Sequence, residues 1–215
     1  MAGASNEYVD PTRLAGFVRW SLVAMIVVDI AAAVSGGMQY GLLMHMQGGA
    51  FPGMKQAARE NDFRQLIAGV VHIVTFVGSG ILVLRWIWRA NKNLHALSPV
   101  PLEYTPGWAV GWYFVPFASL WKPFQVMREI WKVSLDVEDS GLLPLWWTFW
   151  ILSNLAGNAT FQLASSRDIG MLMASGIAGI VHDVCNIGAA IILIQTVAKV
   201  TRAQRRLPAL SETFS

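Results

Sequence analysis

Long apolar segments separated by short polar stretches dominate this chain. Residues 66–84 form a run of nineteen without a formal charge, and residues 170–198 form a longer run whose only charged residue is Asp183. A bilayer core of roughly 30 Å takes about 20 helical residues to cross, so these lengths predict membrane-spanning helices. No stretch alternates as a barrel strand does, which favours a helical membrane protein.

Four of five apolar segments are long enough to span a membrane. The five are residues 14–36, 66–84, 108–121, 142–163 and 170–198. The third is short and contains Pro116, so it suits a segment that re-enters the membrane from one side or lies at its surface. Apolar positions then recur at helical spacing as far as Leu135, which predicts an amphipathic interfacial helix. The predicted fold is an all-α integral membrane protein with four transmembrane helices.

The chain is predicted to form one membrane domain over residues 1–215. Its parts are a first helical hairpin (14–88), a Trp-rich re-entrant segment with the interfacial helix (89–135), a second hairpin (142–200) and a basic C-terminal tail (201–215). Residues 37–62 are predicted to be an external connection whose charged run folds as a short surface helix.

The charge distribution predicts that both termini are cytoplasmic. In this topology twelve of the sixteen Lys and Arg residues lie on the cytoplasmic side, where such residues collect. Nine of the ten Trp residues lie between Trp86 and Trp150, which predicts an aromatic belt at the same interface. A net charge of +3 without a basic arm argues against nucleic acid, and the basic tail suits anionic lipid headgroups.

One apolar segment is nearly repeated. Residues 67–84 and 177–194 are identical at eight of eighteen positions, and the matches include His72 with His182 and Gly69 with Gly179. In the predicted topology both segments cross in the same direction. The two hairpins would then form a parallel repeat about a pseudo-twofold axis along the membrane normal.

The two histidines are the candidate functional site, with Gly69 and Gly179 one helical turn earlier on the same faces. Two opposed imidazoles with glycine clearance could ligate a b-type haem or share a metal ion or proton. Alternatively, they form a hydrogen bond between helices that the glycines bring close together. The other polar residues predicted to be buried in the membrane are Asp29, Asn154, Asp183 and Asn186.

The central block carries a family resemblance. Residues 85–97 read RWIWRANKNLHAL, and residues 104–134 read YTPGWAVGWYFVPFASLWKPFQVMREIWKVS. This block resembles the bacterial membrane family catalogued as domain of unknown function 4328. The resemblance implies a multi-pass protein of the bacterial inner membrane and supplies no activity.

Polar residues in this block are predicted to hydrogen-bond the backbone of a re-entrant turn around Pro116, either as a structural plug or as a docking site. The candidate interaction residues are Arg85, Arg89, Asn91, Trp108, Trp112, Trp121, Arg128 and Trp131.

No nucleophile elbow, Walker sequence, HExxH or Rossmann fingerprint is present, which argues against hydrolase and kinase chemistry. The leading hypothesis is a non-enzymatic accessory subunit that binds the bilayer and a membrane-protein partner or a second copy of itself. The alternative is a haem- or metal-binding conductor of electrons or protons that uses His72 and His182. A third hypothesis is a transporter of small ions or solutes.

Overall fold

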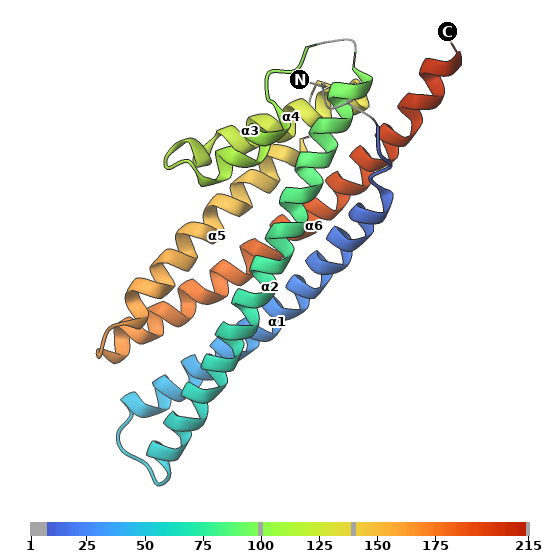
Figure 1. The fold of residues 1–215 in the computed structure, drawn as a ribbon. Coiled ribbons are helices and arrows are strands. Elements are labelled where there is room, and N and C mark those ends of the chain that lie inside the picture. Colours follow the sequence, from blue (N-terminus) through green and yellow to red (C-terminus); the bar gives the residue numbers. More distant parts are fainter. Residues whose placement is uncertain (1–7, 99–100, 139–140, 214–215) are drawn as a thin grey trace. The chain divides into compact units, whose positions relative to one another are not determined.

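The computed structural model describes residues 8–98, 101–138 and 141–213, and every regular element within these ranges is a helix (Figure 1). In chain order the elements are α1 (Thr12–Gln47), α2 (Met54–Leu97), α3 (Pro106–Gly111), η1 (Trp112–Phe114), η2 (Ala118–Leu120), α4 (Lys122–Leu135), α5 (Leu142–Ala164) and α6 (Ile169–Thr213). The predicted all-α class is confirmed.

Three helices are long and apolar enough to cross a membrane. They are α1, α2 and the Ile169–Arg206 part of α6. α5, which is not among these three, has 23 residues and coincides with the fourth predicted segment to within one residue.

The predicted connection over residues 37–62 is wrong, because α1 and α2 both extend into it. Residues 48–53 alone separate the two helices, and the charged run begins α2 instead of forming a separate helix. Gly49 and Gly53 have φ angles of 121° and 81°, a backbone conformation that glycine adopts without steric cost. Helix α1 therefore continues through Gly36 and Gly37 and ends shortly before Gly49, whereas Gly53 directly precedes α2.

The chain divides into two compact units. The first unit comprises Met1–Leu22, Gly78–Trp147 and Ile191–Ser215, and the second comprises Val23–Val77 and Thr148–Ala190. Helices α1, α2, α5 and α6 each contribute residues to both units. The Trp-rich block lies mainly in the first unit and the histidine pair in the second.

The apolar face of α4 is buried inside the first unit, contrary to the prediction that it faces lipid. Met127 and Ile130 of α4 are fully buried, and Trp131 is 4% exposed. Trp86 of α2 and Trp146 of α5 are 0% and 3% exposed, so these three Trp residues belong to the core and not to an interfacial belt. The apolar periodicity does mark a helix face that is buried, but its partner is protein instead of lipid.

The third apolar segment is divided into α3, η1 and η2, none of which is long enough to span a bilayer. Phe114 and Phe117 beside its turn are 72% and 80% exposed. The expected bond from Asn91 to the backbone around Pro116 is not formed. The Asn91 amide donates instead to the Tyr104 carbonyl at 3.0 Å.

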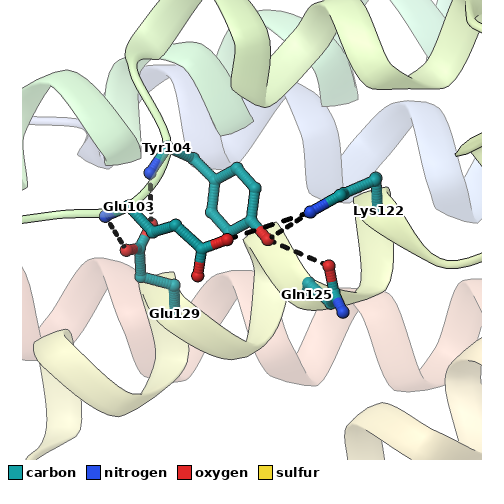
Figure 2. Close-up of polar contacts among 5 residues, drawn as sticks. All are labelled: Glu103, Tyr104, Lys122, Gln125 and Glu129. Atoms are coloured by element: carbon teal, nitrogen blue, oxygen red, sulfur yellow. Dashed lines mark hydrogen bonds and ion pairs between the residues drawn. The ribbon is translucent and has the colours of Figure 1, made fainter.

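A polar cluster holds the chain before α3 against α4 (Figure 2). The Glu129 carboxylate accepts hydrogen bonds from the backbone N–H groups of Glu103 and Tyr104. The Tyr104 hydroxyl donates to the Gln125 amide oxygen at 2.9 Å and accepts from Lys122 Nζ at 3.2 Å. Lys122 also pairs with the Glu103 carboxylate at 3.8 Å. These contacts fix where the third apolar segment begins.

Burial raises the pKa of Glu129 above its ordinary value, although the two backbone donors oppose this shift. The folded state therefore retains a proton that the unfolded chain has already released, and the stability that this adds is lost as pH rises past 4.5 through the raised pKa. We expect the free energy of unfolding of wild type to fall more than that of Glu129→Gln as pH rises above 4.5. Denaturation measured in detergent at several pH values checks this, and parallel curves would contradict it.

Candidate functional site

The two repeated histidines face each other in the second unit. His72 Nε2 of α2 and His182 Nε2 of α6 lie 3.5 Å apart, and the ring planes are inclined by 53°. The structure thus brings together the pair that the internal repeat singles out. Both rings are half-buried.

The position of a proton on His182 follows from its neighbour. His182 Nδ1 lies 2.7 Å from the Ser153 carbonyl oxygen of α5. A carbonyl oxygen can only accept, so Nδ1 carries the hydrogen, and Nε2 of the neutral ring bears a lone pair directed at His72.

His72 lies beside a carboxylate, with which it forms no hydrogen bond. Its Nδ1 lies 3.4 Å from Oδ1 of Asp29, whose side chain is fully buried, and the other Asp29 oxygen accepts a hydrogen bond of 2.8 Å from Asn186. An ionised Asp29 favours the ring hydrogen of His72 on Nδ1, and in that tautomer both Nε2 atoms present lone pairs to each other. Such a pair requires a cation or a proton between the two nitrogens.

A second carboxylate completes the cluster. Three possible ligand atoms lie within 4.8 Å of one another, one each from His72, His182 and Asp183. Asp183 is 6% exposed. Within the described ranges, no Lys or Arg forms an ion pair with either carboxylate. Two buried acidic groups without a basic partner favour a bound cation or protonation.

Glycines shape the space around the rings. A Cβ atom at Gly157 of α5 would lie 3.0 Å from His182 Nδ1, so this glycine permits the close approach of α5. A Cβ atom at Gly69 would meet nothing within 4 Å. Gly69 and Gly179 both line a cavity of about 270 Å³, the vestibule, which ends at the histidine pair. The glycine clearance predicted beside the imidazoles is therefore part of a larger cavity.

The distance between the histidines distinguishes two kinds of ligation. Two ligands about 2.05 Å from one metal are about 3.3 Å apart at a tetrahedral angle and about 4.1 Å apart on opposite sides of it. The observed 3.5 Å and the inclined rings suit neighbouring ligands on a single ion. Axial ligation of a haem needs opposite ligands with a macrocycle between them. The geometry favours a metal ion over haem.

The other predicted polar residues are placed differently from one another. Asp29 and Asp183 are buried and Asn186 is half-buried, as the sequence predicts for polar groups inside a bundle. The prediction is wrong for Asn154, which is exposed and donates to the Trp150 carbonyl of its own helix at 2.7 Å. This local bond satisfies its amide without a partner on another helix.

The predicted interaction residues do not form one exposed surface. Asn91 and Trp131 are buried, and Arg89 and Trp112 are half-buried. The exposed members are Arg85, Trp108, Trp121 and Arg128. Asn91 and Trp131 therefore serve the packing of the first unit.

Sequence reasoning missed the Ser153 carbonyl and Gly157 as parts of the site. A backbone carbonyl carries no sequence signal, and Gly157 resembles any small residue at a helix contact. Both lie on α5, which shares no repeat with α1. The repeat therefore could not reveal them.

The sequence model of the family described as "Domain of unknown function (DUF4328)" matches residues 52–202. This range extends well beyond the central block and includes both histidines and Asp183, but not Asp29. Neither the comparison with curated proteins nor that with solved structures finds a match.

Proposed function

We infer that this chain, which belongs to the family described as domain of unknown function DUF4328, is a membrane protein that binds a divalent transition-metal cation between its helices. The ligands in this proposal are His72, His182 and Asp183. One observation carries it: the Nε2 atoms of the two histidines face each other at 3.5 Å beside the two buried carboxylates of Asp29 and Asp183.

The arrangement around the ligands supports this function. Metal-binding histidines commonly donate their second N–H to a carboxylate or a carbonyl, as Asp29 and Ser153 would require here. A divalent cation would balance the charges of Asp29 and Asp183 with no other charged group. Imidazole ligands suit zinc, copper, nickel and iron better than calcium or magnesium.

We place the site in a four-span topology. α5 is the fourth span in this proposal, and the segment at residues 108–121 re-enters the membrane from the cytoplasmic side. Both termini would lie in the cytoplasm of a bacterium, in the inner membrane, as the distribution of Lys and Arg supports.

An accessory role with a membrane-protein partner or a second copy is the second candidate function. The exposed aromatic side chains around the re-entrant turn, Phe114 and Phe117, support it. This role and metal binding are compatible, but only metal binding uses the buried cluster.

Metal titration of the detergent-purified, chelator-washed protein tests the inference. We expect wild type to bind about one equivalent of Zn²⁺ or Co²⁺, and bound Co²⁺ to give the visible absorption of a tetrahedral site. The double variant His72→Ala/His182→Ala should bind none, because it keeps only one of three ligands.

The matched control removes the remaining two histidines of the chain. His45→Ala/His95→Ala should bind Co²⁺ as wild type does, since neither residue belongs to the cluster. A metal-free wild type, or equal loss of binding in both double variants, would overturn the proposal and leave the accessory role.

A further inference from the structure

Two separate cavities meet at the histidine pair. The vestibule, about 270 Å³, lies on one side of the pair, and a second cavity of about 130 Å³ lies on the other. His72 and His182 are the two residues that line both. Along α2 the vestibule is lined by residues 65–72 and the second cavity by residues 72–76, so the cavities follow each other along the helix.

The vestibule has several polar residues in its lining and begins near the α5–α6 connection. Gln39, Gln65, Thr160 and Ser175 line its outer part, and Asp183 lies at its inner end. Thr160 is four residues from the end of α5 and Ser175 six residues from the start of α6, which places them about 6–9 Å from the connection between these helices. A cavity of this size and polarity can hold several water molecules.

The second cavity has a different lining. Ile73, Phe76 and Trp150 contribute apolar side chains, and its volume is about half that of the vestibule. A hydrated cation gains less there than in the vestibule, because Ser153, Asn154 and Asn186 are neutral and the lining has no carboxylate. The two cavities therefore differ in what they can admit.

We propose that the metal reaches the histidine pair only through the polar vestibule, so that the site is loaded from the membrane face that carries the α5–α6 connection. This inference rests on the proposed metal-binding function. The cation exchanges its water for imidazole and carboxylate at the inner end, and the smaller cavity beyond the pair, which has no carboxylate, blocks its onward passage. In the proposed topology the loading face is opposite the cytoplasm.

Gly69→Leu tests the route without touching a ligand. Open space surrounds the position of a Cβ atom at Gly69, so the leucine side chain can fold into the vestibule and narrow it. We expect association and dissociation of Co²⁺ to slow by about 10-fold or more while the equilibrium Kd changes little, because the ligands are unchanged. Stopped-flow absorption measures both rates.

The matched control is Gly80→Leu, on the same helix and likewise with nothing within 4 Å of its Cβ position. It lines neither cavity and should leave both rates at the wild-type values. Sidedness is tested in liposomes that contain Co²⁺-loaded protein and are treated outside with EDTA. The chelator should remove metal only from molecules whose α5–α6 connection faces outward, as measured by labelling Arg167→Cys in the Cys185→Ser background.

The outcomes separate the two proposals. A normal Co²⁺ spectrum with wild-type rates in Gly69→Leu would overturn the route alone, as would removal of metal from both orientations or passage of Co²⁺ into the vesicles. The absence of any Co²⁺ spectrum in wild type would overturn the metal site and the route together.

Discussion

Asp29→Asn is expected to weaken Zn²⁺ binding by about 10- to 100-fold, although the side chain at position 29 does not touch the metal in the proposed site. The amide replaces one carboxylate oxygen by an N–H donor. If the amide oxygen keeps the bond from Asn186, the new donor faces His72 Nδ1, which must then accept. The ring hydrogen of His72 moves to Nε2, the nitrogen that would bind the metal.

A hydrogen on His72 Nε2 blocks the proposed metal site. His72 Nε2–H can donate to the lone pair of His182 Nε2 across the 3.5 Å gap, and the pair becomes a hydrogen bond between helices. Zinc must break this bond and displace the hydrogen, and it loses the charge of Asp29 as well. We therefore expect affinity to fall while the metal-free protein keeps or increases its thermal stability, because an ionised buried carboxylate has been removed.

Calorimetric titration and thermal denaturation of the same preparation check both parts. Asp62→Asn is the control, since Asp62 is exposed on α2 and should leave the Kd for Zn²⁺ unchanged. Equal affinity in Asp29→Asn and wild type would show that Asp29 does not orient His72. A large loss of stability without metal would show that the carboxylate serves packing instead.

The histidine pair could be predicted from sequence because its two members lie in the repeated segment. A constant offset of 110 residues puts His72 and His182 at one level if the helices run in the same direction, and this is where the rings meet. The bounds of helix α5 could be predicted equally well, since its apolar run is bounded by polar residues. In both cases a pattern within one segment of the sequence was enough to predict the structural feature.

The partners of the pair could not be predicted, because they depend on packing between helices that share no pattern. Gly36 illustrates the difficulty. Its sequence context with Gly37 indicates a helix end, but a Cβ there would lie 3.4 Å from Ile180, so the glycine serves close packing of α1 and α6. Trp131 is of a residue type that is common at membrane surfaces, but it is buried inside the first unit. Composition cannot distinguish lipid from protein as the apolar neighbour.

Gln204 joins several helices of the first unit through buried hydrogen bonds. It is fully buried, and its amide donates to the Ala90 carbonyl at 3.0 Å and to the Ser134 hydroxyl at 3.1 Å. Its oxygen accepts from Asn93, whose amide in turn binds both backbone groups of Val9. One side chain thus links α6 to α2 and α4.

Gln204→Ala should lower the free energy of unfolding of this unit by roughly 2–4 kcal/mol. The change removes the donor to the Ser134 hydroxyl and one of the two acceptors of the Asn93 amide, which keeps the Val9 carbonyl, and it creates a cavity among packed helices. Unfolding by denaturant in detergent, followed by the fluorescence of the buried Trp residues, measures the loss. Gln195→Ala is the matched control, because Gln195 is an exposed glutamine on the same helix and should change stability by less than about 0.5 kcal/mol. Equal effects of the two substitutions would mean that water or lipid headgroups replace the Gln204 bonds, and the network would then position these helices without stabilising them.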